Sequence, residues 1–394
     1  MKITNLRSTI LSVPFKKPTF WPYGRMDGMT VTVIELETDE GIVGIGENAC
    51  IQIPAEGYKH FVDGTASLLM GEDPFNTERI RKKIEGFGGW VFGRQFAGYA
   101  LGGIDMALWD IIGKACGQPV YKLMGGMIRG KSECFNYIPH DKPEIMAQDA
   151  KEAVEQGYET LYCKYTDIAH LRKAIEAIRG TVGYGPKLWV DFNETLSPGF
   201  AVQFLKEMEK YRIDIVEQPV KAQNLDGMAY VKNSVSSRIL AHESSWTLYD
   251  VLNVIKKDAA DIVSVEPRMT WGMMETKKAA GVAEAAGIPV IMHSFAELGV
   301  GTAAFLHVIA STPNFILANQ CMYDWFADDY IRGGKLQFEK AYLRVPEGPG
   351  LGVELDLEKM KEYHENYKRV GTYAVFGVHP DMLLTAPIPL WPSY

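Results

Sequence analysis

Three acidic residues recur at one interval in the middle of the chain. Asp191, Glu217 and Glu243 are each 26 residues apart, and each closes or follows a short apolar run. A helix cap or a strand-end ion pair would explain any one of them, but equal spacing favours a shared role. Carboxylates that converge repel one another unless a cation holds them. Because oxygen ligands select hard divalent ions, the spacing predicts a Mg²⁺ site, with Mn²⁺ as the alternative.

Residues that can carry protons stand on both sides of this acidic series. Lys164 lies near the end of the apolar run before Asp191, and His293 lies near the end of a run after Glu243. This order would put one base on each face of whatever the metal holds. Glu266, between Glu243 and His293, is positioned to hydrogen-bond His293 and orient its ring.

The segments that carry these residues repeat along the chain. Eight short apolar runs follow one another at a spacing of about 25 residues, which is the length of one βα unit. They cover residues 133–138, 160–165, 187–193, 213–219, 238–244, 261–267, 289–294 and 315–320. Eight such units close into an α/β fold of the (β/α)-barrel type, in which active groups lie at the C-terminal ends of the strands. A doubly wound open sheet is the structural alternative.

The first third of the chain has a different pattern. Residues 31–47 alternate between apolar and polar on both sides of a turn at residues 39–41, which predicts a hairpin. Helical spacing follows from about residue 59 to 124. We therefore expect an α+β capping domain over residues 1–126, a catalytic barrel over 127–355, and a C-terminal segment over 356–394 that packs back on the capping domain.

Composition limits the class of protein. A hydrophobic content of 47% and a charged content of 23% are typical of a globular protein. The net charge of −8 and the lack of a basic stripe argue against nucleic acid as a partner. The five cysteines form no CxxC pair, which favours a reducing compartment. Without a signal peptide or an apolar stretch of about 18 residues, a cytoplasmic location away from membranes is expected.

Longer motifs resemble those of a known family. The segments "GGIDMALWDIIGKACGQPVYKLMGG" (102–126), "VDFNE", "VEQP" and "GPGLGVELD" (348–356) resemble signatures of the enolase superfamily, in its mandelate racemase and muconate lactonizing enzyme branch. The resemblance covers almost the whole chain. It implies a modified TIM barrel with a capping domain, Mg²⁺ that binds a small carboxylate substrate, and a lysine or histidine that removes the α-proton. A homo-oligomer is also expected.

The resemblance assigns roles position by position. Asp191, Glu217 and Glu243 match the metal ligands, Lys164 matches the second lysine of the family's KxK pair, and His293 matches the histidine base on the seventh strand. Glu266 stands where the partner of that histidine is normally an aspartate. Asn193 is expected to contact the substrate or support the ligands. His242, which adjoins Glu243, stays open as an additional ligand.

Two positions depart from the family pattern. Tyr162 replaces the first lysine of the KxK pair, and its hydroxyl would orient Lys164, contact the substrate or replace Lys164 as base; the first role is preferred. Asn319 replaces a common glutamate on the eighth strand that faces developing charge on the substrate. Residues 17–28, with Trp21, Tyr23 and Arg25, would close over the mouth as a substrate-binding lid.

The resemblance leaves several reactions open. The favoured one is dehydration of a hydroxy or sugar acid to a 2-keto-3-deoxy acid, in which Lys164 takes the α-proton and His293 protonates the leaving hydroxyl. The alternative is a racemase or epimerase, in which His293 returns a proton to carbon on the other face. A cycloisomerase and a barrel that binds metal and ligand without turnover are less favoured.

Overall fold

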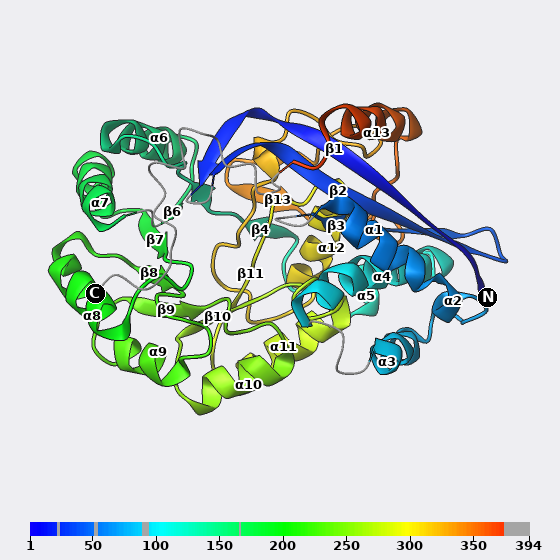
Figure 1. The fold of residues 1–394 in the computed structure, drawn as a ribbon, viewed down its shortest axis with the longest axis horizontal. Helices are drawn as coiled ribbons and strands as arrows, with labels where there is room; N and C mark the ends of the chain where they lie inside the picture. Colours follow the sequence, from blue (N-terminus) through cyan, green and yellow to red (C-terminus); the bar gives the residue numbers. More distant parts are fainter. Residues whose placement is uncertain (22–23, 51–53, 89–93, 165–166, 374–394) are drawn as a thin grey trace.

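A curled parallel sheet lies at the centre of the fold (Figure 1). The computed structural model describes residues 1–21, 24–50, 54–88, 94–164 and 167–373. Within these residues the sheet has seven strands, which are β5 (Asn136–Tyr137), β6 (Thr160–Lys164), β7 (Lys187–Asp191), β8 (Ile215–Glu217), β9 (Arg238–Ala241), β10 (Ile262–Val265) and β11 (Val290–Met292). Neighbouring strands pair in parallel and follow the order of the chain.

Helices connect these strands and lie around the outside of the sheet (Figure 1). They are α6 (Pro143–Glu155), α7 (Ile168–Val182), α8 (Pro198–Glu207), α9 (Leu225–Lys232), α10 (Leu248–Lys256), α11 (Met273–Ala285) and α12 (Gly299–Ala310). Each strand is followed by a helix that returns the chain, so the C-terminal ends of the strands share one side of the barrel. The predicted barrel class is confirmed.

The eighth predicted strand, over residues 315–320, does not form a regular ladder. This segment makes an isolated bridge between Asn319 and Cys134, and its Gln320 nitrogen donates to the Met292 oxygen at 2.9 Å. It therefore lies between β11 and β5 and closes the barrel. The Asn319 side chain accepts the Met292 N–H at 2.8 Å, so a side-chain amide takes a place that a strand would give to backbone.

The first predicted strand, over residues 133–138, is split in two. Its first part belongs to β4 (Lys131–Glu133), which pairs antiparallel with β13 (Tyr342–Arg344), and β13 pairs in turn with β12 (Phe338–Glu339). Its second part is β5, which begins the parallel sheet. The chain thus changes sheet within one apolar run, because that run packs against two different neighbours.

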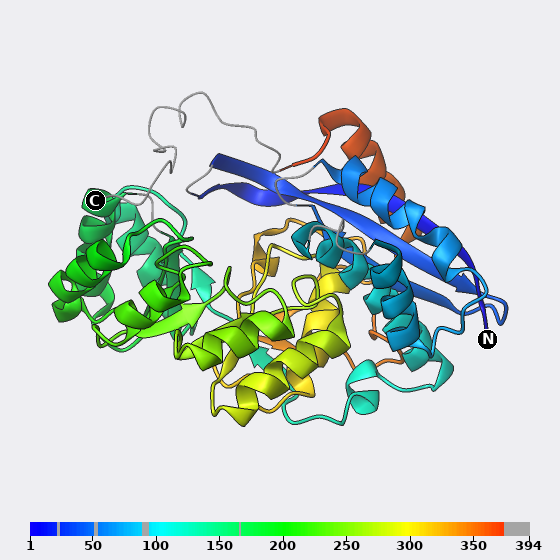
Figure 2. The same cartoon turned by 60° about the horizontal axis from the view of Figure 1, so that its bottom comes forward.

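An antiparallel sheet and its helices form the N-terminal part (Figure 2). Its strands are β1 (Ile3–Trp21), β2 (Gly24–Thr38) and β3 (Val43–Ala49), and its helices are α1 (Ala55–Gly64), α2 (Ala66–Leu69), α3 (Thr77–Gly88), α4 (Arg94–Ala115) and α5 (Val120–Leu123). The pairing of β2 with β3 confirms the hairpin predicted over residues 31–47. None of the helices among the described residues has the length and apolar character needed to cross a membrane.

The last described helix, α13 (Leu357–Val370), lies against β1 (Figure 1). The Asn366 amide nitrogen donates to the Ser12 carbonyl at 2.7 Å, and the Tyr373 N–H donates to Thr30 Oγ1 at 2.8 Å. Residues 357–373 thus contact the N-terminal sheet. The rest of the predicted C-terminal segment, residues 374–394, lies outside the described residues, and the two predicted boundaries, after residues 126 and 355, stay predictions.

A buried carboxylate joins β3 to the barrel. Glu47 is 1% exposed, and its oxygens accept from Leu298 N at 2.7 Å, Gly301 N at 3.1 Å and the Tyr330 hydroxyl at 2.5 Å. Leu298 and Gly301 lie at the N-terminus of α12, where backbone N–H groups have no partner within the helix. Glu47 therefore links the N-terminal sheet to the barrel segment that follows His293.

Close packing of α4 on β3 depends on glycine at position 46. A Cβ atom placed there would overlap the Gly103 carbonyl oxygen in α4. We expect Gly46→Ala to lower the free energy of unfolding by about 2–3 kcal/mol, measured by urea unfolding. Gly86→Ala in α3 is the control, because its Cβ would meet no described atom within 4 Å and alanine favours helix by about 0.5–1 kcal/mol. Equal effects of the two changes would contradict this packing.

Candidate active site at the mouth of the barrel

The predicted site residues stand level at the C-terminal edge of the sheet. Lys164 pairs with Asp191 across β6 and β7, and Asp191 pairs with Glu217 across β7 and β8. Glu243 follows β9 by two residues. Glu266 and His293 directly follow β10 and β11. The structure thus brings the predicted metal ligands and both predicted bases to one end of the barrel.

Lys164 lies against Asp191. Its Nζ is 2.5 Å from Asp191 Oδ2 and 2.9 Å from Asn193 Oδ1, and the lysine side chain is 11% exposed. Burial favours the neutral amine, but the charge of Asp191 outweighs it, helped by Tyr137 and Glu217, and raises the pKa of Lys164. The ammonium therefore neutralises part of the carboxylate cluster in this structure.

Tyr162 orients the same carboxylate. Its hydroxyl donates to Asp191 Oδ2 at 2.7 Å, and its ring stacks on Phe135 with centroids 4.5 Å apart. Burial, followed by the charges of Asp191 and Glu217, raises the pKa of Tyr162 well above its usual value. The hydroxyl thus contacts Asp191 rather than Lys164, so its predicted role of orienting Lys164 stays a prediction, and the raised pKa argues against Tyr162 as the base.

We expect Tyr162→Phe to slow α-proton exchange by about 10–100-fold without abolishing it, because only support for Asp191 is lost. Exchange in D₂O, followed by NMR, measures this. Tyr363→Phe is the matched control, since its hydroxyl also donates to a carboxylate, Asp328, at 2.7 Å, but from α13. If Tyr162→Phe abolishes exchange while Lys164→Ala stays active, Tyr162 is the base.

Protein donors hold the two glutamates of the cluster. Glu217 Oε2 accepts from Trp189 Nε1 at 2.9 Å and from Gln320 Nε2 at 3.1 Å. Glu243 Oε1 accepts from Asn193 Nδ2 at 2.9 Å. His242 Nδ1 lies 2.9 Å from Glu217 Oε1 and 3.5 Å from Glu243 Oε2. Asn193 and His242 therefore tie the predicted ligands into one network.

Burial and like charge act together on this network. Burial first, and then the charge of Asp191, raise the pKa of Glu217. Burial likewise raises the pKa of Glu243 to about 7, although His242 opposes the rise. Burial alone would lower the pKa of His242, but Glu243 and Glu217 raise it to about 9. Burial and the neighbouring carboxylates thus disfavour the charged forms of both glutamates, which a bound cation would favour.

The donor set fits a hard divalent cation. All three predicted ligands are carboxylates at the ends of neighbouring strands, and among the described residues Glu243 Oε2 has no hydrogen-bond partner although it is buried. As the side chains stand, no three His, Cys, Asp or Glu residues in the described part are arranged as a metal site. Lys164 and His242 contact the carboxylates instead.

His293 lies on the other side of the cluster. Its ring centroid is 3.9 Å from that of His242, and its Nδ1 is 4.0 Å from Glu266 Oε1, which is beyond hydrogen-bond distance. Burial, followed by the positive charges of His242 and Arg268, holds the pKa of His293 well below its usual value. The neutral ring can accept a proton.

Sequence reasoning missed Arg268 and Gln218. Arg268 is fully buried, and its Nε donates to Glu266 Oε2 at 2.9 Å. Gln218 Oε1 accepts from His242 N at 3.0 Å and Ser244 N at 3.2 Å, so it fixes the backbone on both sides of Glu243. The available signals were a charged residue two positions after Glu266 and the glutamine of "VEQP".

The predicted role of Asn319 needs correction. Its Oδ1 accepts from Met292 N, and its Nδ2 donates to Ser132 Oγ at 3.1 Å, so its polar atoms face the barrel wall. The next residue, Gln320, reaches Glu217. The irregular eighth segment shifts the alternation of inward and outward side chains by one position.

The predicted lid is only partly described. Arg25 is exposed and pairs with Asp27 at 2.7 Å. The structure describes the backbone of Trp21 at the end of β1, and Tyr23 lies outside the described residues. Substrate binding by these residues therefore stays a prediction.

A cavity of about 590 Å³ adjoins Glu243. Phe96 and Trp246 supply aromatic walls, and Gln223 and Asn253 add polar groups. Phe96 comes from α4 and the other residues come from the barrel loops and α10. The cavity therefore combines both parts of the chain, as expected for a site that a capping domain covers.

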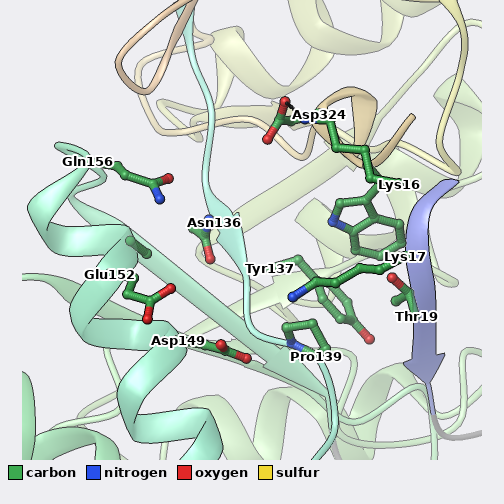
Figure 3. Close-up of a pocket in the computed structure, with 12 residues that line it drawn as sticks. Lys16, Lys17, Thr19, Asn136, Tyr137, Pro139, Asp149, Glu152, Gln156 and Asp324 are labelled. Atoms are coloured by element: carbon green, nitrogen blue, oxygen red, sulfur yellow. Dashed lines mark hydrogen bonds and ion pairs between the residues drawn. The ribbon is translucent and has the colours of Figure 1, made fainter. Parts of the chain in front are cut away.

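A smaller cavity, of about 180 Å³, lies between β1 and α6. Figure 3 shows Lys17 extending from β1 toward Pro139, with Asp149 and Glu152 on the α6 side. Tyr137 lines this cavity, and its ring is 5.2 Å from that of Tyr162. The cavity is thus a neighbour of the Lys164 side of the mouth.

The fold and the site define a class of protein: a (β/α) barrel with a capping domain and a carboxylate cluster flanked by a lysine and a histidine. Residues 6–125 match the mandelate racemase / muconate lactonizing enzyme N-terminal domain, and residues 145–360 match the enolase C-terminal domain-like model. The chain belongs to the enolase superfamily, in its mandelate racemase and muconate lactonizing enzyme branch.

Curated relatives span nearly the whole chain. The hydrophobic dipeptide epimerase of Enterococcus faecalis is 30% identical over 359 residues, which is 90% of this chain and 99% of that protein. The N-succinyl-L-Arg/Lys racemase of Bacillus cereus is 30% identical over 369 residues, covering 92% and 98%. The D-galactonate dehydratase of Ralstonia pickettii is 29% identical over 383 residues, covering 92% and 95%.

A solved structure agrees with this match. The Enterococcus faecalis dipeptide epimerase, complexed with Mg and the dipeptide L-Leu-L-Tyr, has a TM-score of 0.83 to this chain at 29% identity. The match covers 90% of this chain and 100% of that one.

Proposed function

We propose that this protein is a racemase or epimerase that removes the α-proton of a carboxylic acid and returns a proton to the opposite face. The observation that carries the proposal is the order of side chains along the sheet edge. Lys164 ends β6, Asp191 and Glu217 end β7 and β8, Glu243 follows β9, and His293 follows β11. Two proton carriers thus flank the cluster, which suits transfer of a proton from one face to the other.

Each side chain has a part in this reaction. Asp191, Glu217 and Glu243 would hold Mg²⁺, which when bound neutralises their charge and polarises the substrate carboxylate so that its α-proton becomes acidic enough to remove. Lys164 and His293 would exchange protons with the α-carbon, each on its own face. The Tyr162 hydroxyl donates to Asp191 Oδ2, and the backbone N–H of Asn193 donates to Asp191 Oδ1. These two hydrogen bonds keep Asp191 in position.

The substrate class that we infer is an amino acid with an acyl or aminoacyl group on its nitrogen. Two relatives that are 30% identical support this class, one described as a hydrophobic dipeptide epimerase and one as an N-succinyl-L-Arg/Lys racemase. The cavity beside Glu243, with Phe96 and Trp246 in its walls, offers space for the part of such a substrate beyond its carboxylate.

Incubation of the protein with Mg²⁺ in D₂O tests the proposal. Single stereoisomers of dipeptides, N-acyl amino acids and sugar acids would be followed by NMR, together with an assay for 2-keto acids. We expect deuterium at the α-carbon, the second stereoisomer and no keto acid. Absence of α-deuterium from every compound would refute proton abstraction altogether.

Dehydration is the second candidate function, and it was the favoured reaction from sequence. A dehydratase is among the relatives, at 29% identity. In that reaction His293 would protonate a leaving β-hydroxyl and no second stereoisomer would form. Keto acid from a sugar acid, without a new stereoisomer, is the result that would select this function.

A further inference from the structure

A buried arginine stands behind the histidine side of the site. Arg268 is 0% exposed and makes two bonds to one oxygen of Glu266: its N–H donates to Oε2 at 3.0 Å and its Nε donates to Oε2 at 2.9 Å. The other oxygen, Oε1, has no hydrogen-bond partner among the described residues and lies 4.0 Å from His293 Nδ1. One carboxylate oxygen is thus fixed, and the other faces the ring.

A second carboxylate completes the surroundings of this arginine. Arg268 Nη2 lies 2.5 Å from Glu297 Oε1, which also accepts from Phe295 N at 3.0 Å. Glu297 Oε2 accepts from Ser294 Oγ at 2.6 Å. These residues belong to the loop that directly follows His293. Arg268 therefore bridges the carboxylate of Glu266, directly after β10, and the loop after β11.

Aromatic rings and helix α4 enclose the guanidinium. Its central carbon lies 5.5 Å from the ring centroid of Tyr99, 5.0 Å from Phe295 and 5.5 Å from Phe305. A Cβ on Gly102 of α4 would come within 2.9 Å of the Arg268 Cα. The side chain thus has little freedom, and its charge faces the carboxylates of Glu266 and Glu297 at once.

We propose that Arg268 is a positioning residue for proton transfer by His293. It holds Glu266 with Oε1 4.0 Å from Nδ1 of His293, so that the nearby oxygen favours the neutral ring with its proton on Nδ1 and leaves Nε2 to exchange a proton with the substrate. The effect of Arg268 on the rate of proton transfer rests on the proposed function, whereas its effect on the position of the proton in the His293 ring does not. Arginine suits this task because its planar fork can bind two carboxylates at once.

The test compares two buried arginines that each pair with a carboxylate. Arg268→Lys keeps the buried charge but loses the fork, and is expected to fold. Arg179→Lys is the matched control, because Arg179 is 3% exposed and its Nη2 lies 2.9 Å from Asp214 Oδ2, at the start of β8 rather than at its end. Both changes should lower stability, so a stability effect alone does not distinguish them.

Two measurements separate positioning from a structural role. The first is ¹⁵N NMR of the histidines in the metal-free protein, in which the His293 signals are those lost in His293→Asn. His293 should be in the Nδ1–H form in the wild type and in Arg179→Lys. In Arg268→Lys it should shift toward the Nε2–H form. The second is the rate at which each substrate stereoisomer exchanges its α-proton in D₂O. Arg268→Lys should slow this exchange by at least about tenfold for the stereoisomer whose α-proton His293 removes, and by less than about threefold for the other stereoisomer.

Each outcome decides something different. An unchanged His293 tautomer in folded Arg268→Lys overturns the positioning role, as does an equal loss of exchange from both stereoisomers. If the wild-type protein exchanges the α-proton of none of the acids for deuterium, the proposed function fails, and the comparison of His293 tautomers alone decides the role of Arg268.

Discussion

Loss of either proton carrier is expected to abolish formation of the second stereoisomer while proton exchange survives on one face. In Lys164→Ala, α-proton exchange should remain only for the stereoisomer whose α-proton His293 removes. In His293→Asn, it should remain only for the stereoisomer whose α-proton Lys164 removes. Overall turnover should fall by at least about 10³-fold in each variant, because general acid–base groups contribute on this scale. Separate incubation of each stereoisomer in D₂O, followed by NMR, measures both effects.

The physical reason is that the two side chains stand on different strands. Lys164 ends β6 and contacts Asp191, whereas His293 follows β11 and contacts His242 and Glu266. Neither can replace the other from its own place. Lys232→Ala is a suitable control, since that lysine pairs with Asp258 away from the mouth. Loss of exchange from both stereoisomers in Lys164→Ala would point to a single base and favour dehydration or another one-base reaction.

Replacing Glu217 by glutamine is expected to remove the response of the protein to Mg²⁺. Glu217 is fully buried in the centre of the cluster, between Asp191 on β7 and Glu243 after β9. A ligand that binds only the folded state stabilises it, by about 2.7 kcal/mol at a concentration 100 times its Kd. Wild-type protein should therefore melt at a higher temperature with Mg²⁺, and Glu217→Gln should show little or no such shift and no α-proton exchange.

Glu47→Gln is the matched control for this experiment. Glu47 is also a buried carboxylate with several donors, but it binds the N-terminus of α12 rather than the cluster. Its variant should lose stability and keep the thermal shift with Mg²⁺. A shift retained in Glu217→Gln, at equal Mg²⁺ concentration, would mean that the metal binds elsewhere or that the other two carboxylates suffice.

The spacing of the apolar runs and of the charged residues alone predicted much of the fold and the equal height of the site residues along their strands. Each βα unit adds one strand to a parallel sheet, so equal intervals bring residues to equal heights, and Lys164, Asp191 and Glu217 do pair across β6, β7 and β8. The alternation in residues 31–47 likewise sufficed for the β2–β3 hairpin, because neighbouring strands joined by a tight turn depend on local sequence.

Contacts between distant segments needed the tertiary structure. The sequence predicted a lysine and a histidine around a carboxylate cluster, but the partners of these groups depend on how loops meet. Arg268 binds Glu297 from the following βα unit, and Gln320 rather than Asn319 reaches Glu217.

The difference between what the sequence predicted and what only the tertiary structure decided has a physical cause. Periodicity, a property of the chain itself, determined which strand ends carry charged groups and in what order. The direction of each side chain depends on whether a segment keeps a regular ladder, and residues 315–320 do not. Only packing against β11 and β4 decided that Asn319 faces the wall, and only the approach of α4 and the loop after His293 enclosed Arg268 between two carboxylates.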